Sequence, residues 1–520
     1  EKKPGTFHEA MQLFWLFALL AGVINYGRLD DYLGPYLVAD LESGRLTDEE
    51  AYRYIHSLWT MIENRRTTVN GRIIVGGKGR KHPKEADVFL HIAMKVAKNC
   101  RYVEPQFTLR FDKDTSEEIW DEALDALGAG ATYPTLYNDD VNVPAVMYGM
   151  RVDEKTAEQY VPFGCTEFVI QGQSTGTPNI CINLLKLLTI YMNDGIDPID
   201  GKRKSGPVPL KKLEEYQTFE EFYDGYKALL DYYLDLSVKA QYHSYEVMNQ
   251  HVSFLFTSLL TDDCIARGKA LLDGGVRYLG GTNETYGNIN TSDSLWVIRD
   301  LVFNQKKYTL RQLNDAMLAN FNGYEALRKD CLNCDKYGND LETADTMAND
   351  LYEFVAKGVR NRGIAIGMQY FLIVISNNQL NTEWGNRTAA SPDGRLSCMY
   401  MNPANNPQGG ANKSGPTAML NSLAKFDAKY HGGSVQNIKF SPSMFNENRA
   451  VIKSLFKTYF AKGGCHLMVT VVDKGVLEDA VEHPENYPDL IVRVSGFSAV
   501  FVDLSPNIQQ ELLSRVLYDE

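Results

Sequence analysis

The sequence predicts an α/β protein with a largely parallel sheet, and three observations support this class. Stripes of apolar residues at helical spacing recur along the chain, each with a recognisable start signal. Short β-prone runs rich in branched and aromatic residues lie between them. The two kinds of segment alternate. Alternation favours parallel strands, because parallel neighbours need a crossover connection that a helix commonly supplies.

Three of the expected helices begin at a threonine followed three residues later by Glu or Gln, the spacing of a capping box. The pairs are Thr47 and Glu50, Thr115 and Glu118, and Thr309 and Gln312. Apolar residues at i, i+3 and i+4 follow each pair, so each segment is predicted to bury one helical face. The second helix is expected to end at Gly128, a C-cap residue.

Five apolar runs are expected to form strands: Arg72–Val75, Gln106–Leu109, Ile438–Phe440, His466–Val472 and Leu490–Val494. Two Gly- and Asn-rich stretches, Gly274–Asn290 and Asn402–Gly415, are interpreted as long ordered loops. Loops of this kind tend to carry functional residues.

The longest apolar stretch, Met11–Ile24, is predicted to be a buried helix. It is too short to span a bilayer, and it lacks the small-residue cleavage site of a signal peptide. The chain begins with Glu1 rather than Met, so we expect an N-terminal portion to be missing.

Composition argues for a globular protein in a reducing compartment. The 520 residues are 44% hydrophobic and 23% charged, with a net charge of −13, which disfavours binding to nucleic acids or to anionic membranes. Eight cysteines in a chain of this length do not form a disulfide scaffold. Reduced thiols and a cytoplasmic location are expected.

Two further cysteine motifs are interpreted as structural. Cys331 and Cys334 could be a metal or redox pair, but no second pair lies at zinc-like spacing, and the following residues suggest a surface. Cys465 and His466 are predicted to pack within a strand. Neither motif is expected to hold a metal ion.

The segment Phe163–Phe168 is the first candidate for chemistry. Cys165 and Glu167 are two residues apart, so their side chains project to the same side of an extended chain. Their neighbours are apolar, which is expected to raise the pKa of Glu167 and suit it to proton transfer near neutral pH. With no cationic neighbour in sequence, Cys165 should stay a neutral thiol, whose S–H bond can be cleaved homolytically.

The second candidate is Gly496, within Arg493–Ala499. A glycine here could serve a turn with positive φ or a close approach of two backbones. It could also hold an unpaired electron, because a Cα radical without a side chain can be planar and delocalised over the flanking amides. The apolar residues that follow, including Phe497 and Phe501, would shield such a radical from solvent and oxygen.

Together these two loops resemble those of the glycyl radical enzymes. Further segments follow the order of that family: Thr6–Ala10, Gly27–Tyr32, Leu136–Asp140, Ser391–Arg395, Lys413–Thr417, Asn437–Phe440 and Val471–Asp473. The resemblance implies a ten-stranded α/β barrel of two parallel half-barrels, with the two loops at its centre. This barrel could lack part of its N-terminal region. The resemblance also implies two units that pack together as one body. The units are a pyruvate formate-lyase-like barrel over 1–400 and a glycine radical domain over 401–520.

The resemblance also implies the cofactor, the partners and the roles. An activating enzyme that uses S-adenosylmethionine and an iron–sulfur cluster would remove hydrogen from Gly496, and the radical would pass to Cys165. The Cys165 thiyl would take hydrogen from a small-molecule substrate, and Glu167 would move a proton. This cycle needs no metal bound to the chain itself, and a homodimer is expected.

Departures from the family pattern indicate its dehydratase and lyase branch. The formate-releasing acyltransferases use two adjacent cysteines, whereas Cys165 stands between Gly164 and Thr166. In diol dehydratases an aspartate fourteen residues after the cysteine binds a substrate hydroxyl. That position here is Asn179, which can hydrogen-bond substrate but cannot take a proton. We therefore predict an eliminase acting on a small hydroxylated substrate.

Three alternatives stay open at this point. A decarboxylase would use the same cysteine on an arylacetate-like acid. A formate acetyltransferase would need another cysteine, such as Cys181, close to Cys165. A non-catalytic homologue or fragment would form no radical.

Overall fold

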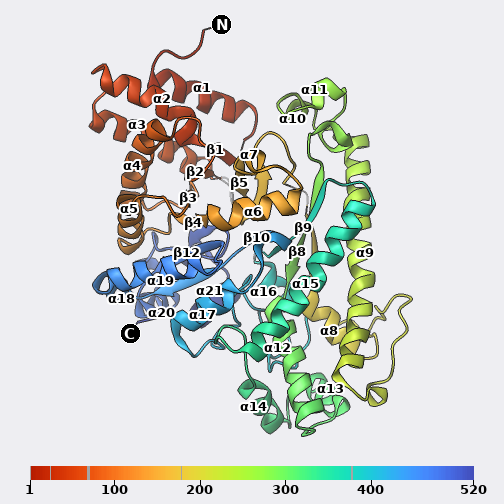
Figure 1. The fold of residues 1–520 in the computed structure, drawn as a ribbon. Helices are drawn as coiled ribbons and strands as arrows, with labels where there is room; N and C mark the ends of the chain where they lie inside the picture. The colour runs from red at the N-terminus through yellow and green to blue at the C-terminus, as the bar shows by residue number, and fades with distance from the viewer. Residues whose placement is uncertain (1, 24, 67–70, 177–178, 376–378, 520) are drawn as a thin grey trace.

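The structure is a computed structural model that describes residues 2–23, 25–66, 71–176, 179–375 and 379–519. In Figure 1 the chain begins in helices at the upper left, runs through the long helices on the right and returns to the lower left. Within the described residues the larger sheets have six and four strands.

The six-stranded sheet combines the first and last parts of the chain. Its order is β1 (Asn25–Arg28), β2 (Arg72–Gly76), β3 (Phe107–Phe111), β4 (Thr135–Asn138), β12 (His466–Val471) and β11 (Asn437–Phe440). β1 to β4 are parallel to one another. β12 is antiparallel to β4, and β11 is parallel to β12. The C-terminal strands thus extend the N-terminal sheet.

The four-stranded sheet is entirely parallel. Its order is β10 (His431–Ser434), β9 (Tyr370–Ile375), β8 (Gly280–Tyr286) and β7 (Asn179–Asn183). Two antiparallel hairpins complete the strands: β5 (Tyr160–Phe163) with β6 (Glu167–Ile170), and β13 (Ile491–Arg493) with β14 (Ser498–Val500). The parallel runs β1–β4 and β7–β10 are consistent with the predicted half-barrels, and the antiparallel pair of β4 with β12 joins the first run to the C-terminal strands.

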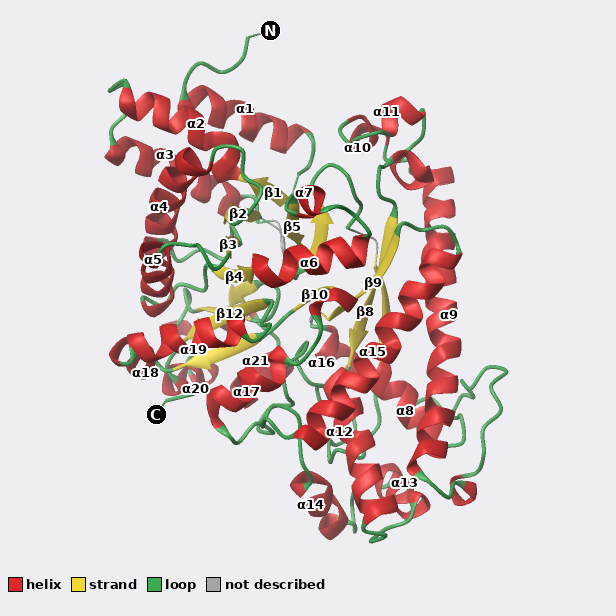
Figure 2. Cartoon of the chain, in the orientation of Figure 1, coloured by secondary structure: helices red, strands yellow, loops and turns green. Residues whose placement is uncertain are grey.

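Helices surround the strands, as Figure 2 shows. α2 and α4 pack on β2, α9 packs on β7, and α15 packs on β9. The helices are α1 (Phe7–Leu20), α2 (Leu29–Glu42), α3 (Asp48–Asn64), α4 (Pro83–Asn99), α5 (Glu117–Gly128), α6 (Asp139–Met150), α7 (Glu154–Ala157), α8 (Leu184–Met192), α9 (Phe219–His251), α10 (Leu255–Leu259), α11 (Cys264–Arg267), α12 (Asn288–Val297), α13 (Leu310–Leu318), α14 (Glu325–Asn333), α15 (Glu342–Ala365), α16 (Leu380–Gly385), α17 (Gly415–Ala424), α18 (Pro442–Glu447), α19 (Arg449–Ala461), α20 (Lys474–Glu482) and α21 (Pro506–Ser514).

The predicted helix starts are confirmed at two of three sites. Thr47 and Thr309 each cap their helix in a full capping box, with Glu50 and Gln312 as partners. The remaining helix, α5, begins one residue later than expected. Ser116 rather than Thr115 is its N-cap, and the helix includes Gly128 before Ala129 closes it.

All five predicted strands are present, shifted by one or two residues at some ends. The interpretation of Gly274–Asn290 as a loop is wrong, because this stretch contains β8. β8 lies between β7 and β9 and is buried along its whole length. Burial between two parallel neighbours outweighs the low strand preference of Gly and Asn. The predicted loop over Asn402–Gly415 is correct up to the start of α17 at Gly415.

The prediction of a buried helix over Met11–Ile24 is wrong in part. α1 ends at Leu20, and Ile24 lies outside the described residues. One face of the helix is buried, but Leu13, Leu16 and Leu20 are exposed, the last by 72%. Among the described residues, no helix is long and apolar enough to cross a membrane.

Candidate active site

The turn of the β5–β6 hairpin carries the predicted cysteine. Gly164 has a φ of +53°, a conformation that favours glycine, and it turns the chain so that Cys165 follows at the tip. A Cβ on Gly164 would lie 2.7 Å from a carboxylate oxygen of Glu167. The turn therefore needs glycine for its backbone conformation and for space.

Gly496 lies in the turn of the β13–β14 hairpin and contacts Cys165 directly. A Cβ on Gly496 would lie 2.6 Å from Cys165 Sγ, well inside van der Waals contact. The φ of Gly496 is outside the left-handed region. Close approach to Cys165, rather than turn strain, is therefore the reason that glycine is required at this position.

Two buried arginines hold the two turns. Arg72 on β2 donates to Gly164 O at 2.8 Å, and it also donates to Gln106 and Thr108 on or next to β3. Arg493 on β13 donates to Ser495 O at 2.7 Å and to Ser498 Oγ at 3.3 Å. Because a guanidinium presents several donors in one plane, each arginine fixes its turn from more than one side.

Cys165 is 1% exposed, and its thiol is neutral. Burial raises its pKa well above the usual value, and the nearby carboxyls of Glu167 and Glu284 raise it further. The expectation of a neutral thiol agrees with these surroundings. Such a thiol suits transfer of a hydrogen atom better than attack as a thiolate.

Glu167 is buried beside Cys165, at the first position of β6. Its Oε2 accepts from the Thr166 N–H at 2.9 Å, and its Oε1 accepts from Asn179 Nδ2 at 3.2 Å. Burial raises the pKa of Glu167 to about 7, with a further contribution from Glu284. The predicted rise in pKa thus has two causes, and the sequence indicated only burial.

A row of polar side chains on β7 and β8 lies next to Glu167. The parallel register pairs Asn179 with Thr282 and Cys181 with Glu284. Glu284 Oε1 accepts from Asn179 Nδ2 at 2.6 Å, and its Oε2 accepts from Tyr286 Oη at 2.6 Å and from Cys181 Sγ at 3.8 Å. Residues two apart on a strand share a face, so Thr282, Glu284 and Tyr286 form one side of β8.

Sequence reasoning missed Glu284 and Tyr286, because the Gly- and Asn-rich stretch around them was interpreted as a loop. The intervening Asn283 and Thr285 are polar as well, so the run Gly280–Tyr286 has no alternation of apolar and polar residues that would indicate a strand.

Asn179 lies between the two carboxyls. Its amide nitrogen donates to Glu167 and to Glu284, and its Oδ1 accepts from Thr282 Oγ1. The amide nitrogen and Oδ1 of Asn179 are therefore both hydrogen-bonded to protein side chains. Direct binding of a substrate hydroxyl by Asn179 stays a prediction.

The remaining cysteine motifs are buried. Cys331 is fully buried on α14, and burial raises its pKa to about 12. Lys336 and Tyr337, which follow the pair, are buried as well, so the prediction that these residues form a surface is wrong. Cys334 is partly buried, and its Sγ donates to Asp330 O at 3.4 Å. Cys465 and His466 are buried as predicted, and the His466 ring packs edge-on against Tyr137.

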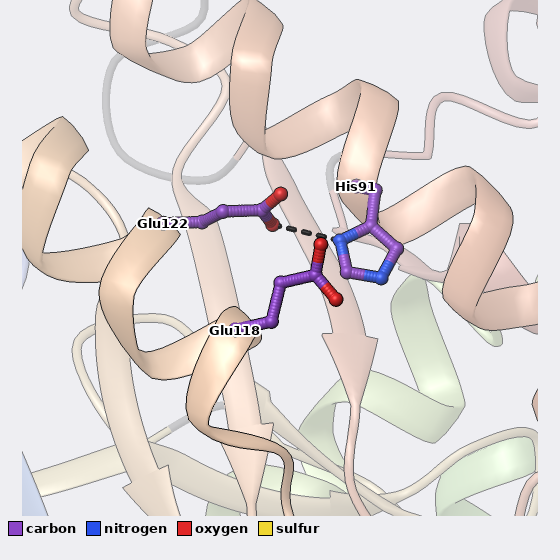
Figure 3. Close-up of side chains that lie close together, drawn as sticks. All are labelled: His91, Glu118 and Glu122. Carbon is purple, nitrogen blue, oxygen red and sulfur yellow. Dashed lines mark hydrogen bonds and ion pairs between the residues drawn. The ribbon is translucent and has the colours of Figure 1, made fainter.

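One group of side chains has the composition of a metal site. Figure 3 shows His91 on α4 facing Glu118 and Glu122 on α5, with all three ligand atoms within 4.8 Å of one another. The group is partly exposed, and His91 Nδ1 lies 2.8 Å from Glu122 Oε2. This hydrogen bond joins His91 to Glu122, and the expectation that no metal is bound stays a prediction.

Comparison with family models decides the family. The model described as pyruvate formate lyase-like matches residues 1–380, and the model described as glycine radical matches residues 401–502. The chain belongs to the pyruvate formate lyase-like family. The resemblance seen in the sequence is thus confirmed.

The curated relatives include dehydratases and lyases. The chain is 28% identical to a trans-4-hydroxy-L-proline dehydratase of Clostridioides difficile, over 99% of this chain and 68% of the relative. It is also 28% identical to a (2S)-3-sulfopropanediol dehydratase of Klebsiella oxytoca, over 98% of this chain and 65% of the relative. The chain spans about two thirds of the length of these relatives.

Solved structures give the same result. The B12-independent glycerol dehydratase of Clostridium butyricum, with glycerol bound, superposes with a TM-score of 0.90 at 28% identity, covering 100% of this chain and 68% of that one. The comparisons confirm the α/β fold of the glycyl radical enzymes and the dehydratase and lyase branch.

Proposed function

We propose that this chain is the catalytic chain of an anaerobic glycyl radical eliminase, a dehydratase or a C–N or C–S lyase, that acts on a small hydroxylated substrate. The observation that carries the proposal is the contact between Gly496 and Cys165 in a buried site beside Glu167. A glycine against a neutral thiol, next to a carboxyl with a pKa of about 7, combines hydrogen-atom transfer with proton transfer.

Gly496 stores the unpaired electron in this proposal, and Cys165 uses it. When substrate binds, the Gly496 Cα radical takes the hydrogen atom from Cys165 Sγ, which leaves a thiyl. The thiyl then takes a hydrogen atom from a substrate carbon. Contact between Gly496 and Cys165 allows the first transfer without movement of either loop.

Elimination follows on the substrate radical, and Glu167 moves the proton. A hydroxyl or amine on the neighbouring carbon leaves after it is protonated, and the hydroxyl on the radical carbon loses its proton. The product radical takes a hydrogen atom from Cys165, and Cys165 recovers one from Gly496. Each cycle ends with both residues as they began.

Partners and assembly belong to the proposal. An activating enzyme that uses S-adenosylmethionine and an iron–sulfur cluster would generate the Gly496 radical. We also propose a homodimer, a cytoplasmic location, and a division at residue 400 between barrel and glycine radical units. The family matches to residues 1–380 and 401–502 support this division.

Electron paramagnetic resonance after anaerobic activation tests the proposal. We expect a doublet from coupling to the one remaining α-hydrogen, and its collapse to a singlet when the protein is labelled with α-deuterated glycine. Since Gly496→Ala places a methyl group against Cys165 and could disturb folding, the isotope experiment is the cleaner assignment. An activated protein with no radical signal would refute the proposal.

Product analysis then separates the chemistries. Activated protein is offered diols, amino alcohols, hydroxyprolines and hydroxysulfonates, and water, amine or sulfite release identifies an eliminase. Release of carbon dioxide would instead identify a decarboxylase, the activity in the name of a 26% identical relative from Clostridioides difficile. Formation of acetyl-coenzyme A would identify an acetyltransferase.

A further inference from the structure

We propose that Glu284 is a positioning residue that, through Asn179, keeps Glu167 protonated, so that Glu167 begins each turnover as the acid that protonates the leaving group. The inference rests on the proposed eliminase function and assigns a direction to the proton transfer. It concerns a carboxyl on β8, a strand that carries none of the residues predicted from the sequence.

The geometry is a carboxyl, an amide and a carboxyl in a row. Asn179 Nδ2 lies 3.2 Å from Glu167 Oε1 and 2.6 Å from Glu284 Oε1. An amide nitrogen has two hydrogens, so one Asn179 side chain can serve both carboxyls. Thr282 Oγ1 donates to Asn179 Oδ1 and fixes which end of the amide faces them.

The hydrogen bonds favour Glu284 as the charged member of the pair. It accepts from Asn179, from Tyr286 Oη and from Cys181 Sγ, and donors of this kind stabilise a carboxylate. Glu167 receives fewer side-chain donors: its carboxyl accepts from the Asn179 amide and the Thr166 N–H, and it lies against Gly164. Two buried negative charges that share one amide nitrogen repel each other, so one of the two carboxyls keeps its proton. The hydrogen bonds favour Glu167 as the carboxyl that keeps it.

Other ionisable groups around Glu167 leave this assignment unchanged. Cys165 and Cys181 are neutral, because burial raises the pKa of each thiol, that of Cys181 to about 12. Tyr137 on β4 is neutral for the same reason. His431, on the strand packed against β6, is uncharged because burial lowers its pKa to about 4.

The guanidinium of Arg72 favours the charged form of Glu167. The guanidinium also donates to Gly164 O, to Gln106 and to Thr108. Burial and Glu284 together outweigh it, since the pKa of Glu167 is raised overall.

The protons balance over one elimination. Glu167 gives its proton to the leaving hydroxyl as the C–O bond breaks, and water departs. The hydroxyl on the former radical carbon becomes a carbonyl and returns its proton to the Glu167 carboxylate. The product radical takes hydrogen from Cys165, so Glu167 ends protonated, ready for the next turnover.

The pH dependence of turnover tests the inference. If protonated Glu167 is the active form, kcat/KM of the wild type falls as pH rises through about 7. Glu284→Gln removes the charge that supports the proton, so the pKa of Glu167 drops and the fall begins about one pH unit or more lower. Glu284→Asp keeps the charge and should keep the fall near its wild-type position.

An infrared measurement gives a readout that needs no turnover. In the unactivated protein at pH 6, protonated Glu167 should give a carboxylic acid C=O band that is absent from Glu167→Gln. The band should titrate away at lower pH in Glu284→Gln than in the wild type. If the band and the pH profile are the same in Glu284→Gln as in the wild type, Glu284 has no such role.

The two measurements distinguish the two proposals. Absence of a glycyl radical and of turnover would refute the eliminase function, while the infrared titration would still report the coupling between the carboxyls. A wild type that turns over, with a rate that rises through pH 7, would overturn the acid role of Glu167 and leave the eliminase function standing.

Discussion

Two sites with buried carboxyl groups differ in the side chain that hydrogen-bonds the carboxyl: an arginine at one site and an asparagine at the other. Asp139, at the start of α6, forms a bidentate ion pair with Arg110 at 2.8 and 2.9 Å, and it also accepts from Tyr160 Oη and the Lys78 N–H. Both partners of that pair are fully buried. Glu167 and Glu284 are instead joined by the neutral amide of Asn179.

The difference separates a structural carboxyl from a chemical one. A guanidinium with two parallel hydrogen bonds fixes the charge of Asp139, which ties β3 and β4 to the β5–β6 hairpin. A neutral amide fixes the position of Glu167 without fixing its charge, so a proton can come and go. A buried carboxylate paired with a cation stabilises the fold, whereas a buried carboxyl held by an amide can gain and lose a proton.

Among substitutions at the two carboxyl sites, the largest effect should come from Glu167→Gln. The amide keeps the shape of the side chain but has no proton to transfer, so turnover should fall by about 10²- to 10⁴-fold. The glycyl radical signal should persist after activation, because Gly496 and Cys165 are unchanged. Turnover near the wild-type rate would show that Glu167 is not the proton donor.

Cys165→Ala sharpens the same distinction. The variant should retain the Gly496 radical and lose turnover completely, since no thiol remains to pass the hydrogen atom.

Exposure of activated wild type to air should cleave the chain at Gly496 and release a fragment of about 25 residues, counted from the numbering. Gel electrophoresis detects the fragment, and an intact chain would contradict storage of the radical at Gly496.

A substitution in the Arg110–Asp139 pair should change the stability of the fold rather than turnover. Arg110→Met leaves Asp139 buried without its cation, which should lower the free energy of unfolding by about 3–5 kcal/mol. Denaturant unfolding measures the change. Arg449→Met, which breaks the more exposed pair with Asp125, is the matched control and should change stability little. An equal loss of stability in Arg110→Met and Arg449→Met would contradict the structural role of the Arg110–Asp139 pair.

A smaller effect is expected in the pH dependence of stability. The pKa of Glu167 is raised from 4.5 to about 7 on folding, so the folded chain holds this proton more tightly than the unfolded chain. Stability contributed by protonated Glu167 is therefore lost as pH rises from about 4.5 to 7, by about 2–3 kcal/mol. Glu167→Gln should lack this slope when unfolding is measured across the range, and a slope shared by both proteins would have another origin.

Local signals predicted much of the fold. The capping boxes at Thr47 and Thr309 form because threonine and its partner three residues on satisfy each other's backbone groups, an interaction contained within four residues. The strands β2, β3 and β12 are apolar enough for their burial to follow from composition. The two loops that meet at Cys165 and Gly496 were also identified from the sequence.

What the sequence did not predict depends on contacts between distant segments. β8 is a strand because β7 and β9 bury it, and nothing within its seven residues indicates those neighbours. The partnership of Glu284 with Asn179 joins residues 105 positions apart. The exposed face of α1 was missed for a related reason, since an apolar run does not reveal how many of its sides are covered.

The register of β7 against β8 has a consequence for how such a protein could change its specificity. The atoms proposed to exchange hydrogen lie in two hairpin turns, while Asn179, Cys181, Thr282 and Glu284 lie on neighbouring rungs of a parallel ladder. Under the proposed function, substitutions along that ladder would change the polar groups beside Glu167 and leave the turns in place. Radical storage and selectivity can therefore diverge independently within one scaffold.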